Sequence, residues 1–365
     1  DRGGAEGLAE GGGERVAAET GGPTETFPAP ARDAAEALPL VAWADVDVQD
    51  GADATEEYAY AAAWTAVSAL VGGLDDETLG TLVAAAYAGE SAYDAPGEPG
   101  RPGLTDGRRF LDLVEVRGEV ADAQAAYRTW VADADETALL DARGPAREAY
   151  VALDAADGQW LPPAGLRTAM TDWAFADADA AREAIGPDAA AAASQVQQAA
   201  DDAGLPDPAA VRTQYESART AEEYAALATV LPRTVEVVGT VGDAVAASTG
   251  GGPFADLGRL LLDVDGSTAE ARAALDTGRL DEADAAADDA SSRAAVAPWV
   301  GIGAVLLVVA ALAGAVVLVV RRRRAAAAAA PAAPDADPAV EQDPVVDGTD
   351  DPADEGKPVV PAAAP

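Results

Sequence analysis

An uncharged run of 22 residues near the C-terminus limits what this chain can fold into more than any other feature. It covers residues 299–320 and reads WVGIGAVLLVVAALAGAVVLVV. A helix of this length measures about 33 Å, because each residue adds about 1.5 Å, and the hydrocarbon core of a bilayer is roughly 30 Å thick. We therefore expect one transmembrane helix over residues 299–320, with the lipid bilayer as its partner. The alternative is the buried core helix of a water-soluble protein.

The charges that flank this run predict its orientation. Four arginines, Arg321 to Arg324, follow it directly, whereas the stretch from residue 281 to 289 before it is acidic. Positively charged residues favour the cytoplasmic side of a membrane helix, and an interfacial aromatic anchor such as Trp299 suits the other end. The sequence thus predicts a single-pass protein of the cell membrane, with its N-terminal part extracytoplasmic and its C-terminal tail cytoplasmic.

The tail covers residues 321–365. After the arginines it is rich in alanine, proline and aspartate, with nine acidic residues and one lysine. A segment with so little apolar surface to bury does not form a packed core. We expect an acidic, disordered cytoplasmic tail.

Composition excludes several classes of function. The 24 Lys and Arg residues face 64 Asp and Glu residues, for a net charge of −40, which argues against nucleic acid as a partner because phosphate binding needs a basic surface. The chain also has no cysteine and no histidine. It therefore cannot form disulfides, a Ser-His-Asp triad or a histidine-ligated zinc site from its own residues alone.

Residues 1–298 are predicted to be mainly α-helical, as a helical bundle or a stack of α-hairpins. Apolar residues recur there at helical spacing between turn and cap signals. Helices are expected to start near Thr55, Asp75 and Asp106, and to cover residues 121–132, 135–155, 166–173, 176–184, 187–203, 209–218 and 221–247, with Pro232 bending or breaking the last. Only residues 38–48 have strand-like character.

Residues 267–290 read STAEARAALDTGRLDEADAAADDA, with small residues at helical spacing on both sides of Gly278. This pattern is typical of a helical hairpin of the tetratricopeptide type. A helical domain over residues 51–265 would thus be followed by a hairpin stalk over residues 266–298, whose second helix runs through Pro298 into the membrane segment.

No catalytic motif stands out among these residues. Paired carboxylates such as Asp75-Asp76 and Asp201-Asp202 are frequent, but in so acidic a chain they are typical of solvated surfaces. Calcium-binding and phosphate-binding loop motifs are absent from the sequence. Four aromatic residues lie among alanines at helical spacing and are predicted to be core wedges: Trp130, Trp160, Trp173 and Phe175.

Several stretches together resemble the C-terminal half of gluzincin metallopeptidases of the membrane alanine aminopeptidase type, in their extracytoplasmic forms from GC-rich bacteria. The similarity extends over residues 5–297. The stretches are AEGLAE (residues 5–10), YAY (58–60), GGLD (72–75), DGRRFLDLVE (106–115), YRTWV (127–131), WLPP (160–163) and DWAFADA (172–178). Gly3 and Gly11 depart from the family, which has aromatic residues at these two positions.

The resemblance implies a zinc-dependent peptidase in which Glu6 is the third zinc ligand. It also implies that Tyr60, or alternatively Tyr58, donates a hydrogen bond to the transition state. The HExxH helix that carries the two histidine ligands and the catalytic base is not in this chain. On this interpretation residues 1–50 are the end of a truncated catalytic domain. The fragment alone is then inert, and zinc binds only if an upstream segment supplies the histidines.

Other interpretations stay open. Glu6 is alternatively a solvated acid in a glycine-rich terminus, and Tyr60 an ordinary tyrosine on a helix face. In place of a peptidase acting on peptide substrates, the chain can be a non-enzymatic, membrane-tethered helical ectodomain that binds a protein or a cell-envelope partner. A third interpretation is a degenerate member of the enzyme family that has lost its motif.

Overall fold

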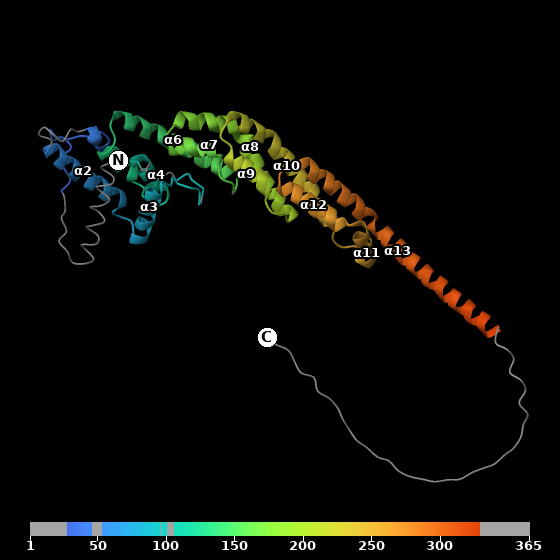
Figure 1. Cartoon of the computed structure of the whole chain (residues 1–365). Coiled ribbons are helices and arrows are strands. Elements are labelled where there is room, and N and C mark those ends of the chain that lie inside the picture. Colours follow the sequence, from blue (N-terminus) through green and yellow to red (C-terminus); the bar gives the residue numbers. More distant parts are fainter. Residues whose placement is uncertain (1–27, 46–52, 96, 101–105, 329–365) are drawn as a thin grey trace, which may run out of the picture. The chain divides into compact units, whose positions relative to one another are not determined.

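The computed structural model describes residues 28–45, 53–95, 97–100 and 106–328, and every regular element in these ranges is helical (Figure 1). The chain divides into two units, residues 1–304 and residues 305–365. In chain order the elements are η1 (Leu40–Asp45), α2 (Asp53–Val71), α3 (Asp76–Ala88), α4 (Gly107–Val116), α5 (Ala123–Trp130), α6 (Ala134–Ala156), α7 (Ala164–Thr171), α8 (Phe175–Ala203), α9 (Ala209–Ser217), α10 (Ala221–Ala247), α11 (Gly252–Leu262), α12 (Val264–Asp276) and α13 (Leu280–Ala328). The predicted mainly α fold is confirmed.

Capping residues set many of the helix starts. The side chains of Asp75, Asp106 and Asp133 each accept a hydrogen bond from a backbone N–H in the first turn of α3, α4 and α6. Thr220 and Glu223 form a reciprocal capping box at the start of α10. These bonds satisfy donors that have no partner inside the helix, so the predicted starts at Asp75 and Asp106 are confirmed.

The strand-like character predicted for residues 38–48 is wrong where the structure describes it. Residues 40–45 instead form the short 3-10 helix η1. Leu40 and Trp43 are three residues apart, so one turn of this helix brings both onto the same side, and both are buried against Ala59 and Ala62 of α2. Packing against α2 therefore overrides the local preference of the valines.

Two prolines act differently on the long helices. Gly186, with a φ of 72°, interrupts α8 just before Pro187, which confirms the predicted gap between two helical segments there. Pro232, by contrast, does not break α10, which extends without interruption from Ala221 to Ala247. Leu231 and Thr234 are fully buried on either side of this proline, so tertiary packing holds the helix together.

The largest core cluster lies among the helices from α2 to α10. Trp160, Met170, Trp173 and Phe175 are among its buried members, which confirms three of the predicted aromatic wedges. Trp130 is only partly buried and packs against a separate small cluster around Trp43.

The predicted hairpin over residues 267–290 is confirmed. Helix α12 ends at Asp276, Gly278 adopts a φ of 73° in the turn, and α13 begins at Leu280 and continues through Pro298. Fully buried alanines of α13, namely Ala283, Ala287 and Ala290, share a core cluster with residues of α10 and α12. This contact is an alanine seam, in which methyl groups take the place of larger side chains.

Candidate functional site

Helix α13 is the only helix among the described residues that is long and apolar enough to cross a membrane. None of its apolar window is buried in the structure, and Leu307 and Leu312 are 72% and 63% exposed. A core helix of a water-soluble protein would be covered by other elements. This exposure is what a lipid-facing helix requires.

The two tyrosines considered for catalysis lie in α2. Tyr58 is buried in the cluster around Trp43, whereas Tyr60 is half-buried and meets the Trp43 ring edge-on, with ring centroids 4.9 Å apart. Both tyrosines therefore contribute to packing, and Tyr60 is the more accessible.

Glu6, the expected zinc ligand, lies outside the described residues. Within the parts of the chain that the structure describes, no three Asp or Glu side chains are grouped so that they could hold a metal ion. The role of Glu6 as a zinc ligand therefore stays a prediction.

A network of buried charges links α4 to α6. The carboxylate of Asp112 accepts hydrogen bonds from Nε of Arg143 at 2.9 Å and from the indole N–H of Trp173 at 2.8 Å. Glu115, one turn along α4, pairs with Nη1 of Arg143 at 2.7 Å and also with Arg147. Burial raises the pKa of the Asp112 carboxyl, and the neighbouring Arg143 guanidinium and Trp173 indole oppose that rise. This set of five residues is the ionic core.

Trp173 is held in an unusual conformation within the ionic core. Its φ is 54°, in the left-handed region that bulky residues rarely adopt. The guanidinium carbons of Arg143 and Arg108 lie 5.4 and 5.7 Å from the centroid of its ring, within the range of cation–π attraction. These contacts and the bond to Asp112 hold the strained residue in place.

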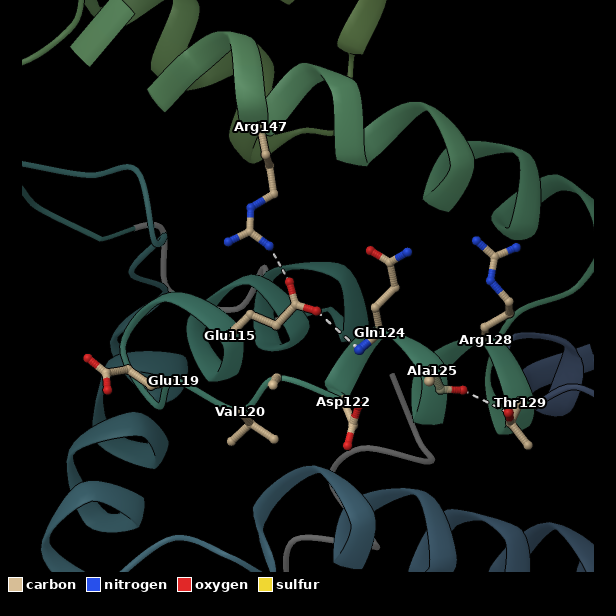
Figure 2. Close-up of a pocket in the computed structure, with 10 residues that line it drawn as sticks. Glu115, Glu119, Val120, Asp122, Gln124, Ala125, Arg128, Thr129 and Arg147 are labelled. Carbon is tan, nitrogen blue, oxygen red and sulfur yellow. Dashed lines mark hydrogen bonds and ion pairs between the residues drawn. The ribbon is translucent and has the colours of Figure 1, made fainter. Parts of the chain in front are cut away.

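A groove of about 740 Å³ opens beside the ionic core (Figure 2). Arg147 reaches from α6 toward Glu115 of α4, and Gln124 and Arg128 extend from α5 toward α6. The groove is lined by Glu115, Glu119, Val120, Ala121, Asp122, Gln124, Ala125, Arg128, Thr129 and Arg147.

Some polar side chains of the groove already form ion pairs or hydrogen bonds within the protein, and others do not. Glu115 accepts bonds from Arg147 and from the backbone N–H of Gln124 at 3.1 Å, and Arg128 pairs with the exposed Asp141 at 2.7 Å. Glu119 and Asp122 form no ion pair with any described residue. Glu119 has a φ of 55°, which is a strained conformation of the kind found at functional sites. The groove thus offers two carboxylates on the loop after α4 that pair with no described residue. It also offers two partly exposed guanidinium groups, on α5 and α6, which already pair with Asp141 and Glu115.

A second buried polar group lies where α6 ends. Asp157 is fully buried, its Oδ2 accepts a hydrogen bond from the Tyr215 hydroxyl at 2.8 Å, and its Oδ1 has no hydrogen-bond partner. Its backbone oxygen accepts a bond from Nε2 of Gln197 at 2.6 Å. Burial raises the pKa of Asp157 to about 7, although the bond from Tyr215 opposes the rise.

Neither the ionic core nor the groove was predicted from the sequence. One signal was present: Asp112 and Glu115 are charged residues three positions apart in the apolar segment FLDLVEV, and Arg143 and Arg147 are spaced by four on α6. Such charges on one face of an apolar helix indicate a buried ion-pair network. Two stretches of the gluzincin resemblance, residues 106–115 and 172–178, supply Asp112, Glu115 and Trp173.

The comparisons with known proteins give no relative. The chain matches no protein-family model, no curated protein and no solved structure at a significant level.

Proposed function

We propose that this protein is a membrane-anchored binding module, in which residues 299–320 cross the bilayer and the helical part before them is displayed outside the cytoplasm. The exposed apolar surface of α13 is the observation that carries the proposal. The arginines from Arg321 to Arg324 support an orientation with the C-terminus inside.

The natural absence of cysteine makes this topology directly measurable. Val151 of α6 and Ala326 near the end of α13 are both exposed, so each can be changed to a unique cysteine with little effect on the fold. In intact cells a membrane-impermeant maleimide should label the Val151→Cys protein, and it should label the Ala326→Cys protein only after permeabilisation. The reverse pattern would contradict the orientation, and release of the protein by alkaline carbonate would contradict anchoring.

The groove beside the ionic core is the surface we propose for the ligand. Its volume lies within the range of about 300–1,000 Å³ typical of small-ligand sites. The partly exposed Arg128 and Arg147 suit a ligand carboxylate as a further partner beside Asp141 and Glu115, and Glu119 and Asp122, which pair with no described residue, suit an ammonium group. A ligand with both charges, such as a short peptide with free termini, matches this arrangement.

Calorimetric titration of the full chain in detergent micelles tests this ligand class. Tri-alanine should bind, and N-acetylated, C-amidated tri-alanine, which lacks both charges, should not. Arg128→Gln should weaken tri-alanine binding by about 10- to 150-fold, since one charge-assisted hydrogen bond contributes about 1.5–3 kcal/mol. Arg182→Gln, which removes an exposed arginine paired with Asp179 in α8, is the matched control and should leave affinity unchanged. Equal binding of both peptides would rule out a site for charged termini.

The resemblance to gluzincins supports a second proposal, the C-terminal part of an extracytoplasmic zinc peptidase. The half-exposed phenol of Tyr60 fits a transition-state donor better than the buried Tyr58 does. The two zinc-binding histidines must then come from polypeptide that precedes Asp1. In a protein extended to include an HExxH segment, Tyr60→Phe should lower kcat about 100-fold or more, and Tyr58→Phe should not. Chelator-sensitive hydrolysis by residues 1–365 alone would contradict this assignment.

A further inference from the structure

Helix α11, which the sequence analysis did not predict, packs against α13 at the beginning of the apolar run. A Cβ atom added to Gly258 of α11 would collide with the backbone oxygen of Ala297, and one added to Gly301 would collide with the backbone oxygen of Phe254. The two helix backbones are therefore in direct contact. Ala297 and Gly301 lie on either side of Trp299, the first residue of the uncharged segment.

The side of α11 that does not contact α13 is apolar and exposed. Ala255 and Gly258 are buried toward α13, whereas Phe254, Leu260 and Leu261 are 46%, 77% and 55% exposed. We call these three side chains, with the half-buried Leu257, the α11 apolar face. At 100° per residue they occupy one continuous arc of the helix. On α13 itself, Val296 and Trp299 are also exposed, at 48% and 74%.

The charged residues of α11 lie outside this arc and are already paired. Asp256 and Arg259 form an ion pair with each other, and Arg259 also donates to the backbone oxygen of Gly250. The helix consequently has a polar edge whose charges are internally compensated. A short amphipathic helix of this kind is suited to the interface between lipid headgroups and acyl chains.

We propose that α11 is an interfacial membrane helix, which inserts Phe254, Leu260 and Leu261 into the outer leaflet beside Trp299. This inference rests on the proposed anchoring of residues 299–320. Because Gly258 and Phe254 contact α13 at residues 297 and 301, this part of α11 lies within about one helical turn, roughly 5.4 Å, of the level where the uncharged segment starts. The end of α11 lies farther out, since the backbone oxygen of Leu262 accepts a bond from Arg293, about 9 Å before Trp299 along α13. Interfacial helices bury their apolar side about 5–10 Å into the headgroup region, so the two depths agree.

The occupant of the α11 apolar face is a bilayer rather than a second protein, because the face is continuous with the start of the membrane segment. Neutral lipid is the appropriate partner, since the acidic chain repels anionic headgroups. The protein then contacts the membrane twice: residues 299–320 span the bilayer, and α11 lies at its outer interface.

The test uses the full chain in phosphatidylcholine vesicles, with an environment-sensitive nitrobenzoxadiazole probe on one introduced cysteine. Leu260→Cys carries the probe on α11, Leu312→Cys places it in the span, and Val151→Cys places it on an exposed apolar position of α6 as the matched control. Phosphatidylcholine brominated along its acyl chains quenches probes that touch lipid. Circular dichroism checks that each labelled protein keeps the helicity of the unlabelled chain.

We expect bromolipid quenching and a shift to shorter emission wavelength at positions 260 and 312, and neither at position 151. Quenching at 260 should be strongest with bromines near the headgroup, and quenching at 312 with bromines deeper in the chains. Quenching at 312 without quenching at 260 would overturn the interfacial helix and leave the anchor intact. No quenching at 312 would overturn the anchor itself.

Two other results would also overturn the inference. A probe at 260 that is shielded from both bromolipid and aqueous iodide would show that protein, such as a second copy of the chain, covers the α11 apolar face. Equal quenching at 260 and 151 would show that the whole ectodomain adsorbs to the membrane without selecting α11.

Discussion

Asp112 and Asp157 are both buried carboxyl groups, but their partners differ. Asp112 bonds to the Arg143 guanidinium and the Trp173 indole, so its charge is compensated. Asp157 has only the Tyr215 hydroxyl on one oxygen and no partner on the other. An unpaired carboxylate in an apolar interior favours its protonated form, which is why the pKa of Asp157 rises to about 7.

This difference predicts a pH effect on stability. In the unfolded chain an aspartate loses its proton near pH 4, but folded Asp157 keeps it to about pH 7. At this residue the folded state thus binds more protons than the unfolded state, so the contribution of Asp157 to stability is highest below about pH 4 and falls as pH rises toward 7. The Asp157→Asn variant lacks this titration. Relative to the variant, the wild type should lose on the order of a few kcal/mol of unfolding free energy between pH 4 and 7.

Denaturant unfolding of both proteins, followed by circular dichroism at several pH values, measures this difference. Taking the difference cancels the titration of the many surface acids. Asp243→Asn, at an exposed site on α10, is the control for the loss of one aspartate charge. If the difference in unfolding free energy between the wild type and Asp157→Asn does not change with pH, water or a rearrangement solvates the carboxylate.

At the scale of helices, the contact between α11 and α13 depends on glycine. Gly258→Ala should destabilise the protein by about 1–3 kcal/mol, because the new methyl group meets the backbone of Ala297 and the two helices must separate. Gly239→Ala, in the middle of α10 where an added methyl meets nothing within 4 Å, should instead stabilise it by about 0.5–1 kcal/mol. Unfolding midpoints in denaturant measure both, and the same sign for the two variants would contradict the close contact.

Most helices were predictable because their ends carry local signals. The aspartate caps at Asp75 and Asp106 and the glycine turn at Gly278 mark their elements in sequence alone. Helix α11 was missed because the glycines at its start, Gly250 to Gly252, suggest a plain turn, and its packing partner is about 40 residues away. The uninterrupted course of α10 through Pro232 likewise depends on tertiary contacts.

At the scale of the whole molecule, the candidate site could not be derived from local patterns. Arg143 and Trp173 lie 31 and 61 positions from Asp112, and only the fold brings them together. The membrane segment is the opposite case, since its length and its flanking charges are contained in one continuous stretch. The roles of Glu6 and Tyr60 in zinc peptidase chemistry stay predictions.

The net charge of −40 predicts a strong dependence of stability on salt. Repulsion among surface carboxylates disfavours the compact state, and salt screens it: the Debye length falls from about 10 Å at 0.1 M to about 3 Å at 1 M. Potassium chloride over this range should raise the thermal midpoint by on the order of 5 °C. Most of the rise should occur at the lower concentrations, where screening changes fastest. A midpoint that is constant or falls would show that repulsion does not limit stability.

The alanine seam does little to fix the axial position of α13. Methyl groups project little from a helix, so a surface built from them has low relief and opposes sliding only weakly. Polar contacts at its edges fix the register instead: Arg233 with Asp284 at 2.7 Å, Ser267 with Asp289 at 3.0 Å, and Arg293 with the backbone oxygen of Leu262 at 3.0 Å. These three bonds therefore fix the axial position of α13 relative to α10, α11 and α12.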